Sequence, residues 1–278
     1  MKSKKILLAL DYHSASVNAY NYALKIAEIE KCELHLLHAF HVPVPALDTA
    51  VPILSMKEVQ TFENKRIDRF VHEHHLKGKL KINAKAIEGL AGDVLEQWVI
   101  KNKPDLVVMG IHETGALDEF LMGSTCERVI KQDLVPILIV PSKARFKKIH
   151  LMTLATDLKE IKIPHISDKL KHFCKRFQSR LMILHITEEN EIKFSEEKEN
   201  LEKLEEELHE IKHQFKETES NKKPEAILHE ILKNRSQWLV LIHKNYSFIR
   251  EIFHKSLIKK MIFNSEIPIL ILNSGYKK

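Results

Sequence analysis

Two stretches of the chain recur in the same order and at the same spacing, and they decide the fold. Residues 102–109 read NKPDLVVM and residues 135–140 read VPILIV, while residues 234–241 read NRSQWLVL and residues 267–272 read IPILIL. The offset between the two copies is 132, taken from Pro136 to Pro268 (268 − 136). Each stretch contains a short apolar run, as expected for a buried strand of a parallel sheet. The repeat predicts two tandem domains.

Working outward from this repeat, short apolar runs alternate with stretches of helical periodicity. We expect strands of the first half at residues 6–10, 34–40, 82–87, 106–109 and 137–140. We expect helices at residues 16–30, 56–75, 91–102 and 124–132, where apolar residues recur every three or four positions. This alternation is typical of strands joined by crossover helices. It predicts an α/β fold with two doubly wound, Rossmann-like domains, each with a mostly parallel five-stranded sheet.

The boundary between the domains is expected near residues 142–146, which gives a first domain at 1–143 and a second at 146–278. The second half contains an apolar series with steps of 3, 4, 3 and 4, formed by Leu201, Leu204, Leu208, Ile211 and Phe215. This series predicts a crossover helix on the sheet or, alternatively, a partner-binding helix. Residues 215–218 are also the one candidate for the third strand of this half.

Composition excludes several classes of protein. The chain has 278 residues, 44% of them hydrophobic, and 44 Lys and Arg against 38 Asp and Glu give a formal charge of +6. Such a chain folds without disulfide or metal staples. The charges are interspersed, and no basic run alternates with aromatic residues, which argues against a nucleic-acid-binding protein. The N-terminal apolar run is too short for an export signal and no run is long enough for a membrane helix, so we expect a cytoplasmic protein.

Histidine and cysteine patterns indicate neither a metal site nor a catalytic group. Cys32, Cys126 and Cys174 lie far apart without a CxxC pair and are expected to be buried free thiols. His35 and His38 belong to a predicted strand, where a spacing of three sends side chains to opposite faces. The sequence also lacks the GxSxG motif of serine hydrolases.

The loop after the fourth predicted strand has the chemistry of an anion site. Gly110, Gly115 and Gly123 occur in it, and Ser124 and Thr125 begin the following helix. Ligands of open parallel sheets bind beyond the carboxyl ends of the strands, where the strand order reverses. Glycines let backbone amides approach phosphate, and a helix start offers unpaired N–H groups. The same glycines are also explained by a helix stop and a helix cap, and both explanations remain open.

The loop, its flanking strands and the helix residues ERVI (127–130) resemble the universal stress protein family. The family pattern is Gly, two residues, Gly, nine residues, then Gly-Ser or Gly-Thr, and the resemblance covers residues 3–141. It implies bound ATP or AMP, with Mg²⁺. The implied contacts are Asp11 to adenine or ribose and Ala39 as an adenine wall, followed by Met109, Gly110 and His112. The implied phosphate contacts are Gly123, Ser124 and Thr125.

Two departures from the pattern bear on this expectation. Glu113 occupies the position of the second glycine, where its charge opposes phosphate binding unless Mg²⁺ intervenes; Gly115 would relieve the backbone but not the charge. In the second half, the offset of 132 replaces the three loop glycines with Ile242, Ser247 and Lys255. We therefore expect no ATP site there.

The sequence predicts a stress-response binding or signalling module. The alternatives are a slow Mg-dependent ATP hydrolase and an interaction scaffold without nucleotide. The resemblance further implies pairing through the last strands, residues 137–140 and 269–272, either between the two domains of one chain or in a homodimer.

Overall fold

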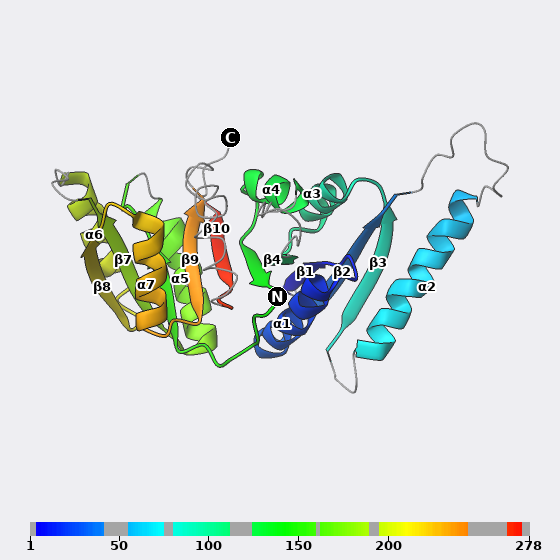
Figure 1. Cartoon of the computed structure of the whole chain (residues 1–278), viewed down its shortest axis with the longest axis horizontal. Coiled ribbons are helices and arrows are strands. Elements are labelled where there is room, and N and C mark those ends of the chain that lie inside the picture. The colour runs from blue at the N-terminus through cyan, green and yellow to red at the C-terminus, as the bar shows by residue number, and fades with distance from the viewer. Residues whose placement is uncertain are drawn as a thin grey trace.

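The computed structural model describes residues 4–41, 55–74, 80–111, 124–159, 162–188, 195–243 and 266–273. These residues form one sheet with helices on both faces (Figure 1). The elements of the first half are β1 (Lys5–Ala9), α1 (Ser14–Glu30), β2 (Glu33–Phe40), α2 (Met56–His74), β3 (Ile82–Glu88), α3 (Ala91–Asn102), β4 (Leu106–Ile111), α4 (Ser124–Lys131) and β5 (Ile137–Pro141). Those of the second half are β6 (Leu151–Ala155), α5 (Ile163–Phe177), β7 (Arg180–Thr187), α6 (Ser195–Glu207), β8 (His213–Glu219), α7 (Lys223–Lys233), β9 (Trp238–His243) and β10 (Ile269–Asn273).

The strand order is β3-β2-β1-β4-β5-β10-β9-β6-β7-β8, so the second half repeats the first in reverse. All neighbours within a half are parallel. In the first half the chain runs outward from β1 through β2 to β3, then returns to place β4 on the other side of β1. The expected α/β fold class with mostly parallel five-stranded halves is confirmed. The strand order reverses between β1 and β4.

The two faces of the sheet carry separate cores because side chains alternate along each strand. Leu8 and Leu36 belong to the core under α1, α2, α5 and α6, while Leu7 and Leu37 belong to the core under α3, α4 and α7. His35 and His38 follow the same rule. His35 lies 5.2 Å from Trp98 of α3, centroid to centroid, and His38 faces Glu63 of α2.

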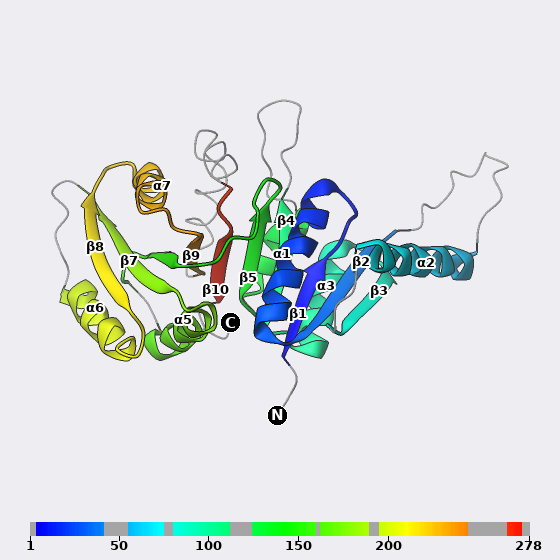
Figure 2. The ribbon, with the colours of Figure 1, turned by 90° about the horizontal axis from the view of Figure 1, so that it is seen from below.

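The two halves are joined by antiparallel pairing of their last strands (Figure 2). Leu138 pairs with Leu270, Ile137 with Ile271 and Ile139 with Ile269. Because the offset of 132 equates Leu138 with Leu270, each strand meets its own counterpart about a local twofold axis. Pairing within the chain is therefore the expected alternative that the structure shows. It occupies the edges that β5 and β10 would otherwise offer to another chain.

Aromatic side chains connect the two halves on the face of the sheet that α1 and α5 cover. Tyr22 of α1 and Trp238 of β9 are both buried, and the indole Nε1 donates a 2.7 Å hydrogen bond to the tyrosine hydroxyl. Phe177 of α5 packs on the same indole, with ring centroids 5.1 Å apart. The two halves therefore share one continuous core here.

Replacing Tyr22 with phenylalanine is expected to lower the free energy of unfolding by about 1–2 kcal/mol, because it leaves the buried indole N–H without an acceptor. Urea denaturation measures this value. Tyr20→Phe is the matched control, because the Tyr20 hydroxyl is buried without a hydrogen-bond partner among the described residues. Equal losses in the two variants would contradict a role for the Tyr22–Trp238 bond.

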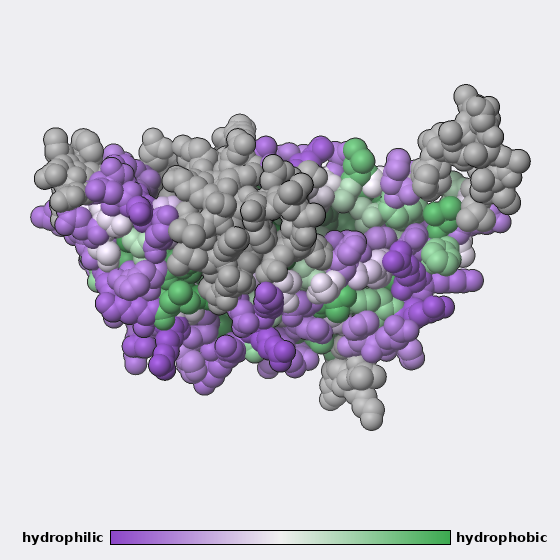
Figure 3. All heavy atoms as spheres, viewed as in Figure 1, coloured by the Kyte–Doolittle hydropathy of each residue, from purple (hydrophilic) through white to green (hydrophobic). Residues whose placement is uncertain are grey.

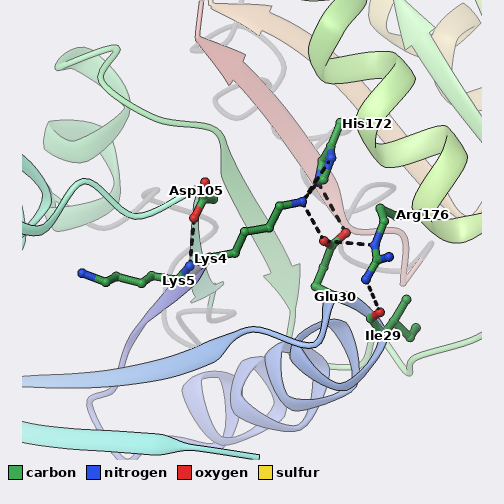
Figure 4. Close-up of polar contacts among 7 residues, drawn as sticks. All are labelled: Lys4, Lys5, Ile29, Glu30, Asp105, His172 and Arg176. Atoms are coloured by element: carbon green, nitrogen blue, oxygen red, sulfur yellow. Dashed lines mark hydrogen bonds and ion pairs between the residues drawn. The ribbon is translucent and has the colours of Figure 1, made fainter. Parts of the chain in front are cut away.

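A buried carboxylate also joins the two halves. Glu30, at the end of α1, has a side chain that is 6% exposed. Lys4 Nζ and Arg176 Nε lie 3.3 and 3.2 Å from its Oε2, and His172 Nε2 lies 3.4 Å from its Oε1 (Figure 4). Arg176 also donates to the carbonyl of Ile29. We call the side chains of Lys4, Glu30, His172 and Arg176 the Glu30 cluster. Because His172 and Arg176 belong to α5, this cluster is a polar link between the two halves.

The second half corrects one expectation about its helical series. The helix predicted across residues 201–215 is wrong in length, because α6 ends at Glu207. Leu204 and Leu208 are buried on the sheet, as expected for a crossover helix. Phe215 lies in β8, so the strand expected at residues 215–218 is confirmed. The change from helix to strand is hard to recognise in this lysine- and glutamate-rich sequence. The apolar residues on both sides of the change fit a helical spacing of four as well as a strand spacing of two.

On the face drawn in Figure 3, the described surface is mostly hydrophilic. The hydrophobic residues on this face form small, separated groups. The exposed large hydrophobic residues come from several elements, among them Phe62 of α2, Ile100 of α3 and Leu232 of α7. Within the described ranges, no helix is long and apolar enough to cross a membrane.

Candidate functional site

A pocket of about 280 Å³ lies at the carboxyl ends of the strands where the order reverses. We call it the switch-point pocket. Residues from the ends of β1, β2 and β4 and from the starts of α1, α3 and α4 line it. They are Ala9, Leu10, Asp11, Ser16, Leu37, Ala39, Ala91, Leu95, Met109, Gly110, Ile111, Thr125 and Cys126. The parallel register brings these strand ends together although they are up to about a hundred residues apart in the chain.

A tight turn after β1 presents Asp11 to the pocket. Tyr12 adopts φ 64°, a left-handed conformation, which reverses the chain direction between β1 and α1. The Asp11 carboxylate accepts the backbone N–H of His13 at 3.0 Å, and the Asp11 N–H donates to the Ser16 hydroxyl at 3.3 Å. The acid is exposed at the pocket mouth. It is positioned to accept hydrogen bonds from a polar ligand.

The backbone below Asp11 is fixed from the opposite face of the sheet. His38 Nδ1 lies 2.8 Å from the Leu10 carbonyl oxygen, and the Tyr12 ring packs on His38 with centroids 4.6 Å apart. Arg66 Cζ also lies over the Tyr12 ring, 4.1 Å from its centroid. The second half repeats the first of these contacts, with His185 Nδ1 3.0 Å from the Thr156 carbonyl oxygen. Sequence reasoning missed this support, which follows from the histidines near the ends of the second and seventh strands.

The walls of the pocket are mainly apolar. Ala39, half-buried near the end of β2, and Met109, buried in β4, both line it as the sequence led us to expect for site residues. Leu37 and Leu95 complete this surface and were not predicted. Leu37 had a signal in the sequence, because a residue two positions before Ala39 shares its face of the strand. Small and apolar walls of this kind suit a flat ring.

Gly110 has a packing role that the sequence did not reveal. A Cβ at this position would lie 2.4 Å from the carbonyl oxygen of Ala15 and 2.7 Å from the amide nitrogen of Ser16. The start of α1 thus approaches β4 too closely for any side chain. The glycine is required to close this side of the pocket, independently of any ligand.

The start of α4 forms the remaining side. Ser124 is the first residue of the helix, and Thr125 and Cys126 line the pocket. Unpaired N–H groups at a helix start attract anions. Burial raises the pKa of the Cys126 thiol to about 12, so this cysteine remains protonated and is not a nucleophile at neutral pH.

The structure brings together Asp11, Ala39, Met109, Gly110 and Thr125 among the predicted site residues. Ser124 begins the adjacent helix. His112, Gly115 and Gly123 lie outside the described residues, as does Glu113. In the second half, Ile242 is in β9 at the counterpart of Gly110.

The described lining fits an adenine nucleotide in part. It offers an apolar slot, a carboxylate at the mouth, and the first residues of a helix, whose backbone N–H groups could contact a phosphate. It does not show a metal centre, since no group of three or more His, Cys, Asp or Glu in the described ranges is placed to hold an ion. The arrangement can bind and orient a ligand, and its described side chains include no paired acid and base.

Comparisons with known proteins support the fold described above. A model of the universal stress protein family matches residues 2–141. A universal stress protein of Methanocaldococcus jannaschii is 28% identical over 138 residues, which are 49% of this chain and 81% of that protein. The crystal structure of a universal stress protein from Archaeoglobus fulgidus has a TM-score of 0.69, covers 99% of this chain and 100% of that chain, and is 16% identical, so it bears on the fold alone.

The crystal structure of a universal stress protein in complex with cAMP is similar to a smaller part of this chain. It covers 51% of this chain and 100% of that chain at 18% identity, with a TM-score of 0.39. This likeness is too low to support an argument about the present pocket.

Proposed function

The chain belongs to the universal stress protein family, and from this premise we propose that its first half binds an adenine nucleotide, ATP or AMP, in the switch-point pocket. The protein then acts as a binding or signalling module of a stress response. The observation that carries the proposal is the joint position of Asp11, Ala39, Met109, Gly110 and Thr125 around one pocket. A cytoplasmic location and the division into domains at 1–143 and 146–278 stay predictions from the sequence.

In the proposed complex, the adenine ring lies between the apolar walls. Ala39 and Leu37 contact the ring from β2, and Met109 contacts it from β4. The Asp11 carboxylate, at the mouth, accepts hydrogen bonds from the ribose hydroxyls or from the adenine amino group. The phosphates then extend toward the start of α4, where the first helical residues provide backbone N–H groups and Thr125 provides a hydroxyl. Mg²⁺, when bound with the nucleotide, would offset the charge of the phosphates.

Filling the apolar slot with a large side chain should weaken nucleotide binding. For Ala39→Trp we expect the affinity for Mg-ATP to fall at least about tenfold, because the indole occupies the place proposed for adenine. Isothermal titration calorimetry of nucleotide-stripped protein measures this effect. Ala39→Ser, which keeps the side chain small, is the control and should bind as the natural protein does. Thermal melting of both variants checks that they fold. Undiminished binding by folded Ala39→Trp would contradict the proposed ring position.

A second titration compares the natural protein with Glu113→Gly. Saturable binding of Mg-ATP by both proteins would support the proposal. Tighter binding by the variant is expected, because the loop loses a negative charge that the family resemblance leads us to expect to oppose phosphate binding. Binding by the variant alone would favour a scaffold that lacks nucleotide. If neither folded protein binds Mg-ATP, ATP is not the ligand of the switch-point pocket. Retention of intact ATP through a chase supports a binding module, whereas steady ADP release that Ser124→Ala abolishes would support slow hydrolysis.

A further inference from the structure

A second cavity, of about 400 Å³, lies between the two halves. We call it the junction cavity. One wall consists of residues at the starts of β1, β4 and β5, including Lys4, Asp105 and Pro136. The facing wall is α5, with His165, Lys169 and His172. The cavity shares no lining residue with the switch-point pocket, and it lies at the opposite ends of the strands of the first half.

Apolar side chains cover part of the junction cavity. Ile26 of α1, Leu106 of β4 and Phe173 of α5 are buried residues of the core under α1 and α5, and they line the cavity together with Ile6 and Cys32. These residues offer a hydrophobic surface of the kind that contacts the body of a small organic ligand.

The carboxylates of the cavity already have partners. Glu30 is held by the Glu30 cluster, in which Lys4 extends toward it while the Lys5 side chain points away (Figure 4). Asp105 accepts the backbone N–H of Lys5 at 2.8 Å. Asp168 pairs with Lys171 at 3.2 Å. The negative charges that would repel an anion are therefore largely compensated.

Lys169 of α5 lines the same cavity. Its ammonium group donates to the neutral amide oxygen of Asn273, and the contacts of the described residues include no carboxylate within ion-pair distance of it. Burial lowers the pKa of Lys169 to about 8, although the charge of Asp133 opposes this shift. Asp133 lies 3.2 Å from His243. A half-buried cation whose direct hydrogen-bond acceptor is a neutral amide is costly, and a bound anion would offset that cost.

We propose that the junction cavity binds a small organic anion, with its charged group beside Lys169 and its apolar body against Ile26, Leu106 and Phe173. The ligand touches both halves, so its binding strengthens their association across β5 and β10. This site does not depend on nucleotide binding in the switch-point pocket.

The first test uses three probes on the full chain. 3-Phenylpropanoate has the proposed charge and apolar body, 3-phenylpropanamide lacks the charge, and inorganic phosphate lacks the apolar body. Titration followed by protein NMR or calorimetry at pH 7 should show that the carboxylate binds about tenfold more tightly than either of the others. Equal binding of carboxylate and amide, or no saturable binding of the carboxylate, would overturn the proposal. Phosphate binding as tight as that of the carboxylate would overturn the role of the apolar surface.

The second test uses variants of α5. Lys169→Gln should weaken 3-phenylpropanoate binding about tenfold, while the amide is unaffected. Asp168→Asn should strengthen carboxylate binding, because it removes an exposed negative charge from the cavity rim without disturbing the core. Lys175→Gln removes a positive charge from the same helix outside the cavity and should change nothing. Unchanged affinity in both Lys169→Gln and Asp168→Asn would refute the site even if one variant were poorly folded.

Discussion

Replacing Glu30 with glutamine is expected to lower the free energy of unfolding by about 3 kcal/mol. The variant keeps the shape of the side chain but leaves Lys4, His172 and Arg176 facing a buried neutral amide. Breaking a buried ion pair by removing one partner typically costs about 3–5 kcal/mol. We expect the lower end of this range, because the Lys4, His172 and Arg176 side chains are 37–42% exposed and water reaches them after the change. Urea denaturation at pH 7 measures the loss.

Glu28→Gln on the same helix is the matched control. Glu28 pairs with Lys25 at the surface, where such pairs contribute less than about 1 kcal/mol. Loss of the Glu30 contacts should also loosen the junction, so amide hydrogen exchange in β5 and β10 should accelerate in Glu30→Gln and not in Glu28→Gln. A Glu30→Gln variant as stable as the Glu28→Gln variant would show that the cluster does not hold the halves together.

The pH dependence of this effect has a definite sign. Burial alone would raise the pKa of Glu30, but the hydrogen bonds and charges of His172 and Lys4 outweigh it and hold the pKa below its ordinary value. A carboxylate with a lowered pKa in the folded state stabilises fully above its unfolded pKa. Its contribution is lost as the pH falls through the lower, folded value. The stability difference between the natural protein and Glu30→Gln should therefore be largest near neutral pH and shrink in acid.

The second large effect is expected for Gly110→Ala, which should lower the free energy of unfolding by about 2–3 kcal/mol. The new Cβ would lie 2.4 Å from the Ala15 carbonyl oxygen, so α1 and β4 must move apart. Overpacking of a well-packed interior typically costs about 1–3 kcal/mol, and here the obstacle is backbone, which cannot rotate aside. Because the movement occurs beside Asp11, Mg-ATP binding should weaken as well. Chemical denaturation and calorimetry measure the two effects.

Gly92→Ala is the control for this substitution. Its Cβ would meet Cδ of Arg128 at 2.7 Å, a flexible side chain that reaches the surface and can shift. Gly92 is in α3, where alanine favours the helix by about 1 kcal/mol relative to glycine. We therefore expect Gly92→Ala to be neutral or stabilising. A Gly110→Ala variant that melts like Gly92→Ala would contradict the close approach of α1 to β4.

Much of the fold could be predicted because its signals are local. The apolar runs that precede Met109 and follow Val135 identified β4 and β5, and the offset of 132 transferred them to β9 and β10. The signal failed in residues 201–215, where a helix and a strand share one apolar spacing across the end of α6. Local periodicity does not record where a chain turns when the turn lacks glycine and proline.

The α/β class, the repeat and the glycine-bearing loop could all be recognised from the sequence, because each depends on short stretches of consecutive residues. Tertiary structure alone decided the rest. It closed Gly110 against Ala15, placed His38 under the Leu10 carbonyl, and joined β5 to β10 within the chain. It also enclosed Glu30 and Lys169 at a junction built from both halves. These features depend on distances between residues far apart in the chain, and such distances exist only after the sheet has set the register of its strands.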